Sequence, residues 1–181
     1  MRITSDMLLF WRSHEIYSNW YLSEFVVEGQ VFNSGEQWMM HAKARLFGDH
    51  EMAARILAEP HPRRQKLLGR QVRGFDAARW SACCEDLVFV GLLEKFRQNP
   101  ALCAEILATA DRLLVEASPD DRIWGIGLEE EDPRALDPAQ WLGENRLGKV
   151  LMRVRAALQP ALEELASEGT NRGLTNQVDL P

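Results

Sequence analysis

The sequence predicts an α+β fold, a compact and mainly helical single domain with short strands. Three observations support this prediction. Apolar residues recur at helical spacing in several segments that begin at capping residues or proline. Short apolar runs bounded by turn residues lie near the N-terminus and again near residue 114, which favours strands at both ends of the helical part. The length of 181 residues suits one domain.

The N-terminal part is predicted to form strands followed by a helix. Residues 7–33 are strand-like, and two apolar runs flank Glu28-Gly29 in the pattern of a hairpin. Residues 34–37 have the S-x-x-Q form of a capping box, which marks the start of a helix. A helix is therefore expected to run to about Phe47, with Gly48 ending it.

The rest of the chain is predicted to hold further helices, one strand and some irregular segments. In chain order we expect helices over 50–59, 62–69, 77–98 and 100–109, a buried strand over 113–115, a short extended piece over 124–127, a solvated acidic loop over 129–138 and a last helix over 145–158. Pro160 is expected to limit that helix, and residues 167–181 have the composition of a frayed tail. The predicted organisation is one domain over residues 1–160 and a C-terminal tail over 161–181.

The charge balance argues against a protein that coats nucleic acid. The chain has 27 acidic and 21 basic residues, a formal net charge of −6. DNA- and RNA-coating proteins carry a basic stripe instead. A small phosphorylated ligand remains compatible with this charge, because a few local cations and backbone amides suffice to bind it.

The cysteines and histidines do not form a metal-binding pattern. Cys83 and Cys84 are adjacent, Cys103 stands alone, and the chain has no CxxC, HxxxH or HExxH motif. We therefore expect no metal, no disulfide framework and no other cofactor. The apolar run over residues 7–11 is too short for a signal sequence or a membrane span, so a cytoplasmic, reducing location is expected.

The first predicted helix carries one candidate set of functional residues. Glu36, Met40, Lys43 and Phe47 follow the i, i+4, i+7, i+11 spacing of a single helix face. Glu36 and Lys43 would lie about 10 Å apart along the axis, a gap that can flank a ligand. The alternative is a solvated edge on which Glu36 caps the first turn.

The second candidate set lies between residues 116 and 127. Glu116 stands in an apolar strand, so its carboxylate either faces outward or lies in a polar pocket. Asp121 precedes Trp124-Gly125; a tryptophan face can stack on a planar base, and glycine lets the backbone approach a ligand. Asp121 would then act as an acid or base beside that group. The alternative is a turn aspartate followed by a core tryptophan.

The third candidate is the start of the last predicted helix. Asn145 is a possible N-cap, and with Gly143 nearby the first turn can offer free backbone amides to a phosphate group. An ordinary capped helix with a solvated basic face is the alternative.

Several ordered blocks of the chain resemble the NADAR family, also called YbiA-like. The resemblance covers about residues 8–158. The blocks that carry it include Tyr17-Ser18-Asn19-Trp20-Tyr21, Ser34-Gly35-Glu36-Gln37-Trp38-Met39-Met40, Asp121-Arg122-Ile123-Trp124-Gly125-Ile126-Gly127-Leu128 and Trp141-Leu142-Gly143-Glu144-Asn145-Arg146-Leu147-Gly148. Ala110 stands where the family often has glycine, and the tail beyond residue 160 has no counterpart.

The resemblance implies a mainly helical α+β fold and an N-glycosidase activity. Such an enzyme hydrolyses the C–N bond between a base-like amine and a phosphorylated ribose. Some members clear ribosylamino-pyrimidine phosphates that arise early in riboflavin biosynthesis. Others release ADP-ribose from modified guanine bases, which is one alternative here; a non-catalytic ADP-ribose-binding module is another. The expected partner is a small phosphoribosyl or ADP-ribosyl substrate, with nucleic acid only as the carrier of a modified base and no membrane.

Positions that match the family's motifs define the expected site. Glu36 is expected to stand at the anomeric carbon, and Asp121 to assist the leaving base or the attacking water. This chemistry needs no metal. The expected substrate-binding residues are Asn19 and Glu116 for ribose hydroxyls, Lys43 and the helix start at Asn145 for phosphate, Trp124 for the base, and Trp20 and Gly125 as further contacts.

Overall fold

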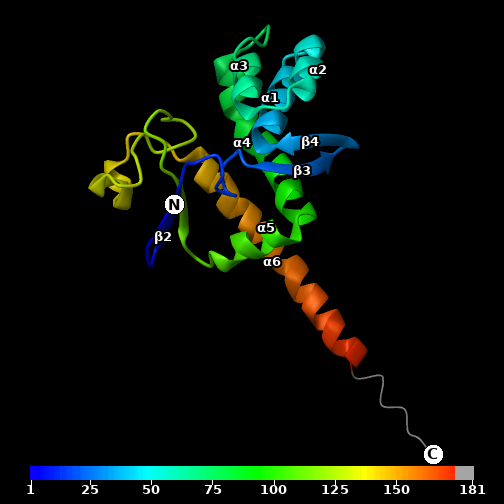
Figure 1. The fold of residues 1–181 in the computed structure, drawn as a ribbon, viewed down its shortest axis with the longest axis vertical. Coiled ribbons are helices and arrows are strands. Elements are labelled where there is room, and N and C mark those ends of the chain that lie inside the picture. The colour runs from blue at the N-terminus through cyan, green and yellow to red at the C-terminus, as the bar shows by residue number, and fades with distance from the viewer. Residues whose placement is uncertain (174–181) are drawn as a thin grey trace, which may run out of the picture.

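The computed structural model describes residues 1–173, and of residues 160–173 it describes only the helical backbone. Figure 1 shows the chain as a mainly helical α+β domain with a long C-terminal helix that leads away from α1, α2 and α3. In chain order the elements are β1 (Arg2–Ile3), β2 (Met7–Phe10), β3 (Leu22–Val27), β4 (Gln30–Ser34), α1 (Gly35–Leu46), α2 (His50–Ala58), α3 (Pro62–Gly69), α4 (Ala77–Gln98), α5 (Pro100–Ala108), β5 (Leu113–Glu116), the 3₁₀ helices η1 (Pro133–Leu136) and η2 (Pro138–Gln140), and α6 (Arg146–Gly173).

Helix α1 lies at the centre of one end of the molecule, where it contacts α2, α3 and α4 (Figure 1). The long helices α4 and α6 pack against each other, and α6 also packs on β5. Buried side chains from these elements form the main core, which includes Met40, Val88, Leu92 and Leu151. The core therefore holds α1 and β5, the two elements that carry Glu36 and Glu116.

The strands form two small sheets. In the first, β2 pairs antiparallel with β1 and parallel with β5, with Phe10 opposite Glu116. In the second, β3 and β4 form the expected hairpin, in which Glu28 and Gly29 take positive φ values of 51° and 79°. The parallel pairing of β2 and β5 places the loops that follow these two strands at the same edge of the sheet.

The start of α1 confirms the predicted helix cap, with one difference. Ser34 Oγ accepts a hydrogen bond from the amide of Gln37 at 3.1 Å, as the S-x-x-Q pattern predicts. The Gln37 side chain, however, accepts from the amide of Asn33 at 2.8 Å instead of returning to Ser34. Its Nε2 donates to carbonyls at the end of α2, so this residue joins two helices. Glu36 is thereby fixed in a buried first turn.

Three expectations about local structure are wrong. Residues 124–127 contain bends and do not form an extended piece, because their amides fold back on preceding residues: the amides of Trp124 and Gly127 donate to Asp121, and the Ile126 amide donates to the carbonyl of Glu116 at the end of β5. The acidic stretch 129–138 is not simply a solvated loop, since it contains η1, in which Ala135 is buried against Ile126 and Leu128. The last helix does not end near Pro160 but continues to Gly173, since the turns before and after a proline can carry a helix past one missing hydrogen bond.

The boundary between a domain over 1–160 and a tail over 161–181 stays a prediction. The helical part of that tail shares α6 with the domain, and residues 174–181 lie outside the described part.

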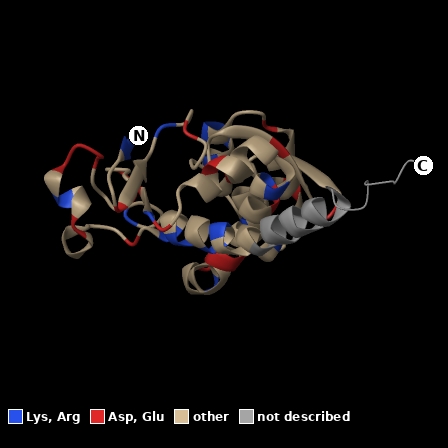
Figure 2. Cartoon of the chain, turned by 90° about the horizontal axis from the view of Figure 1, so that it is seen from below, with Lys and Arg blue, Asp and Glu red and all other residues tan. Residues whose placement is uncertain are grey.

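Charged side chains are spread over much of the molecule. Figure 2 shows basic and acidic segments interspersed along the described chain. Across residues 1–173, no helix combines the length and the apolar character that a membrane crossing requires.

Candidate active site

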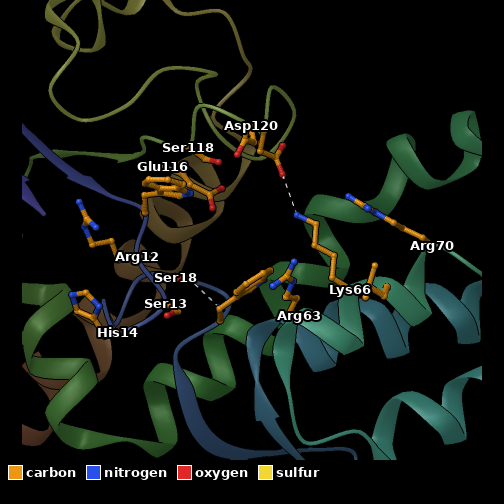
Figure 3. Close-up of a pocket in the computed structure, with 14 residues that line it drawn as sticks. Arg12, Ser13, His14, Ser18, Arg63, Lys66, Arg70, Glu116, Ser118 and Asp120 are labelled. Carbon is orange, nitrogen blue, oxygen red and sulfur yellow. Dashed lines mark hydrogen bonds and ion pairs between the residues drawn. The ribbon is translucent and has the colours of Figure 1, made fainter.

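A cavity of about 740 Å³ lies where three segments meet. Residues 11–14 of the loop after β2 form one wall, helix α3 forms another, and the loop after β5 closes the third side (Figure 3). The lining side chains are Trp11, Arg12, Ser13, His14, Ser18, Trp20, Arg63, Lys66, Leu67, Arg70, Glu116, Ser118, Asp120 and Asp121. The cavity is thus rich in cations although the chain is acidic overall.

Glu36 is a buried carboxyl group at the inner end of the site, with 2% of its surface exposed. Its Oε2 accepts a hydrogen bond from the indole nitrogen of Trp20 at 3.2 Å. Its Oε1 has no hydrogen-bond partner among the described residues. Burial raises the pKa of Glu36 to about 7, although Lys66 and the Trp20 hydrogen bond oppose that shift. Glu36 can therefore change its charge near neutral pH.

Glu116 is a second carboxyl group in this region, at the end of β5 and in the wall of the large cavity. Its Oε2 is buried and also lacks a hydrogen-bond partner within residues 1–173. Burial raises its pKa to about 8, and the nearby negative charges of Asp121 and Glu36 add to the shift. This side chain is therefore a neutral acid at neutral pH.

Asp121 differs from both glutamates in its partners. Its Oδ1 accepts hydrogen bonds from the amides of Ile123 and Trp124, at 3.0 and 2.8 Å. Its Oδ2 lies 3.6 Å from Nζ of Lys66 on α3. Local amides and a facing cation thus balance the negative charge of Asp121.

A smaller cavity of about 150 Å³ adjoins the first and shares Lys66, Arg70 and Asp121 with it. Glu36, Lys43 and Trp124 line this smaller space, so the structure brings together four of the residues expected in the site, with Asp121 as the fourth.

The ammonium group of Lys43 already has partners at the far side of the smaller cavity. It donates to the carbonyl of Gly69 at 2.9 Å and lies 4.1 Å from the centre of the Phe75 ring. Burial lowers the pKa of Lys43. A phosphate group bound there would compete with these contacts.

Asn19, Gly125 and Asn145 do not line the cavities described above. The side chain of Asn19 packs against Gly35, while its backbone carbonyl accepts from the amide of Glu36 at 2.8 Å. A Cβ on Gly125 would come within 2.8 Å of the Glu116 carbonyl, so glycine permits close packing of the loop itself. Asn19 and Gly125 therefore contact the elements that carry the site and do not line its cavities.

The expectation that the start of the last helix offers free amides to phosphate is wrong. The amides of Arg146 and Leu147 donate to the carbonyls of Ile123 and Trp124. The side chain of Asn145 instead clamps β5: its Oδ1 accepts from the Glu116 amide at 3.0 Å and its Nδ2 donates to the Leu114 carbonyl at 2.9 Å. The start of α6 is therefore hydrogen-bonded to β5 and to the loop after it, so the amides of Arg146 and Leu147 are unavailable to a ligand.

Sequence reasoning missed the cations that surround the large cavity. Arg63, Lys66 and Arg70 come from α3 and its end, and Arg12 lies on the opposite wall (Figure 3). The signal was present, because the i, i+3, i+7 spacing of the α3 residues places them on one helix face. Among the described residues, Arg63 and Arg70 have no ion-pair partner, so both remain able to bind an anion.

A third cavity of about 490 Å³ continues from the first and shares Ser13, His14, Trp20 and Arg63 with it. Tyr21 and His61 line its outer part. No group of three or more His, Cys, Asp or Glu side chains within residues 1–173 is arranged to hold a metal ion.

Comparisons with known proteins agree on one family. A model described as the NADAR domain matches residues 9–159. The chain is 38% identical over 171 residues to protein irg-1 of Caenorhabditis elegans, which covers 86% of this chain and 81% of that protein. It is 41% identical over 145 residues to N-glycosidase R617 of Acanthamoeba polyphaga mimivirus, with 77% and 85% covered.

Two more distant similarities concern a longer protein and a solved structure. The chain is 28% identical over 147 residues to riboflavin biosynthesis protein VVA0006 of Vibrio vulnificus, which covers 81% of this chain but 36% of that protein. The NMR structure of the Escherichia coli protein YbiA superposes with a TM-score of 0.71 at 26% identity and covers 91% of this chain and 90% of that one. This likeness confirms the predicted α+β class.

Proposed function

The chain belongs to the NADAR domain family and is an N-glycosidase, and from this premise we propose that it hydrolyses the bond between the anomeric carbon of a phosphorylated ribose and the nitrogen of a base-like amine. The proposed substrates are the ribosylamino-pyrimidine phosphates of riboflavin biosynthesis, and their removal would clear reactive intermediates. The similarity to proteins named for riboflavin biosynthesis supports this choice.

One observation carries the proposal: buried Glu36 and half-buried Glu116 each keep one buried, unpartnered carboxyl oxygen beside cavities lined by cations. Oε1 of Glu36 and Oε2 of Glu116 have no hydrogen-bond partner among residues 1–173. Leaving buried polar atoms unpaired costs about 1–3 kcal/mol each, so such atoms point to a missing ligand. A ribose with its hydroxyl groups and an N-linked amine supplies suitable donors.

The two glutamates can divide the work of hydrolysis. As the C–N bond breaks, positive charge develops at the anomeric carbon, and ionised Glu36 stabilises that charge and takes a proton from the attacking water. Protonated Glu116 gives its proton to the departing nitrogen. The hydroxyl of water joins the carbon and the nitrogen gains one proton, so the reaction consumes one water. In this scheme Glu116, expected from the sequence to bind ribose hydroxyls, takes the role of assisting the leaving base that was expected of Asp121.

The remaining groups hold the substrate in position. Arg63 and Arg70 are the best-placed phosphate ligands, because both line the large cavity and neither has an ion-pair partner among the described residues. Asp121 fixes Lys66 between the two cavities. Trp124 lines the smaller cavity beside Glu36, where its ring can contact the base.

A second candidate function is release of ADP-ribose from a modified guanine. The observation that favours it is the cavity of about 490 Å³ that continues from the main one past Trp20. A substrate with a second nucleoside would use that space, whereas a phosphorylated ribose with a single base would leave it empty.

A product assay separates the two candidates. Purified protein is incubated in parallel with the ribosylamino-pyrimidine phosphate and with an ADP-ribosylated guanine oligonucleotide. Release of ribose 5-phosphate from the first supports the main proposal, and release of ADP-ribose from the second supports the alternative. Binding of ADP-ribose with neither product formed would contradict both and favour a binding module.

A further inference from the structure

Lys95, on α4, is a fully buried lysine that does not line the catalytic cavities. Its side chain has 0% exposure. The ammonium group donates to the carbonyls of Ile16 and Ser18, at 2.9 and 3.1 Å. It lies 5.4 Å from the ring centres of both Tyr21 and Phe96. Within residues 1–173 it has no acidic ion-pair partner, and its burial lowers its pKa to about 7.

A lysine in this position is costly to bury. Desolvation of an ammonium group disfavours folding, and an apolar side chain of similar length would fill the same space without that cost. The ammonium group is stabilised by its hydrogen bonds to the carbonyls of Ile16 and Ser18. Both belong to residues 16–20, a turn-forming part of the segment that connects β2 to the hairpin.

The same turn holds Glu36 at two points. The carbonyl of Asn19 accepts a hydrogen bond from the Glu36 amide at 2.8 Å, which fixes the start of α1. The Trp20 indole nitrogen donates to the Glu36 carboxylate at 3.2 Å. The Trp20 amide in turn donates to Ser18 Oγ at 3.1 Å. Lys95 therefore binds the same short segment whose Asn19 and Trp20 contact Glu36.

We propose that Lys95 is a positioning residue of the N-glycosidase: by binding the carbonyls of Ile16 and Ser18 it holds the Trp20 indole against Glu36 and keeps that carboxylate in its reactive, ionised form. This role rests on the proposed function only in naming Glu36 as the reacting carboxylate. The contacts that connect Lys95 to Glu36, through the backbone of Ser18 and the side chain of Trp20, do not involve the substrate.

The test compares Lys95→Met, Trp20→Phe and the double variant. The first removes the ammonium donor and keeps the length of the side chain, and the second removes only the indole donor. The titration of Glu36 is followed in the substrate-free protein by NMR of ¹³C-labelled glutamate carboxyls, with its signal identified by its loss in Glu36→Gln. The pH dependence of kcat/KM is measured alongside.

Both single variants should raise the pKa of Glu36, because a hydrogen bond to the charged carboxylate is lost. The expected shift is about one pH unit, with the acidic limb of kcat/KM moving by the same amount. The double variant should shift no further than Trp20→Phe. The other charged or titratable groups that interact with Glu36 are unchanged in all three proteins; they are Lys43 on α1, Lys66 on α3, Arg70 at its end, Glu116 on β5 and Asp121 in the loop after β5.

Arg155→Met is the matched control. Arg155 is also a buried cation that donates to a carbonyl, but its partners are Arg112 and Thr109, not the turn over residues 16–20. Arg155→Met should leave the pKa of Glu36 unchanged even if it lowers the melting temperature of the protein.

Two results would overturn the proposal. One is an unchanged Glu36 titration in folded Lys95→Met. The other is a double variant whose shift equals the sum of the two single shifts, because Lys95 would then act through space and not through Trp20. If Lys95→Met does not fold, Lys95→Gln takes its place, since it also removes the ammonium group that donates to the carbonyls of Ile16 and Ser18 and should move the titration in the same direction. Absence of turnover on any N-glycoside, with the NMR shift present, would reject the proposed function and leave the positioning role standing.

Discussion

Nζ of Lys66 lies 3.6 Å from Oδ2 of Asp121, so helix α3 and the loop after β5 meet at a single ion pair. This pair forms part of the wall of both the large and the small cavity. The charge of Lys66 acts on the carboxyl groups of both Glu36 and Glu116 and opposes the rise in the pKa of each. The balance of charges at this point sets which carboxyl groups carry a proton at neutral pH.

The pH dependence of activity should follow from that balance. We expect kcat/KM to rise as Glu36 ionises near pH 7 and to fall as Glu116 loses its proton near pH 8, which gives a bell-shaped profile. Glu116→Gln should remove the basic limb and lower the maximum by about 100-fold. Steady-state kinetics across this range checks both points, and a profile that stays flat from about pH 6 to about pH 9 would contradict the assignment.

The buried carboxyl group of Glu36 should also make stability depend on pH. Its pKa is about 7 in the folded protein against 4.5 for an unperturbed glutamate, so its contribution to stability is present below pH 4.5 and is lost as the pH rises through 7. Glu36→Gln cannot ionise and should therefore be more stable than the parent by about 3 kcal/mol at pH 9, with no gain at pH 4.5.

Urea denaturation at the two pH values measures this difference. Glu129→Gln, at an exposed position, is the control and should change stability little at either pH. Equal effects of Glu36→Gln at both pH values would show that the group is not buried with a raised pKa.

The cations on α3 should control affinity more than turnover. Arg63→Gln and Arg70→Gln should each raise KM for a phosphorylated substrate about tenfold and leave kcat nearly unchanged, because they bind the phosphate equally in the ground and transition states. Arg64→Gln is the matched control, since Arg64 neighbours Arg63 on the same helix but does not line the cavity. If Arg64→Gln raised KM by the same factor, the phosphate would not be bound by Arg63 and Arg70 in the large cavity.

Much of the fold was predictable from short-range signals. The cap at Ser34, the proline at the start of α3 and the cap at Asp76 mark helix starts that the structure confirms. The same rules failed at Pro160 and in the loop after β5. In that loop the backbone hydrogen bonds join residues whose spacing neither helix nor strand periodicity predicts. The amide of Leu142, for example, donates to the carbonyl of Ile126.

The site was predictable where residues share one element and harder to predict where elements meet. Glu36 and Lys43 face one cavity because they share a face of α1. Asn145 has the chemistry of a helix cap, yet its positive φ of 53° and its bonds to β5 make it a clamp between elements far apart in sequence. The pairing of α3 with the loop after β5 depends on tertiary packing, which no local pattern encodes.

Asn145 should therefore affect stability and not substrate affinity. Asn145→Ala removes the partners of the Glu116 amide and the Leu114 carbonyl and places alanine at a positive φ, so it should destabilise the fold by about 3 kcal/mol. Denaturant unfolding measures the loss, and KM of the folded variant should change less than about threefold. A large rise in KM with unchanged stability would instead show that Asn145 binds the substrate.

The most direct test of the account is a single-turnover comparison of the parent protein with Glu36→Gln. Enzyme in excess over ribosylamino-pyrimidine phosphate is quenched at intervals, and ribose 5-phosphate and the released base are both quantified. We predict equal amounts of the two products from the parent and a rate at least about 100-fold lower for the folded variant. Turnover by Glu36→Gln at near the parent rate would remove Glu36 from the chemistry and contradict the mechanism.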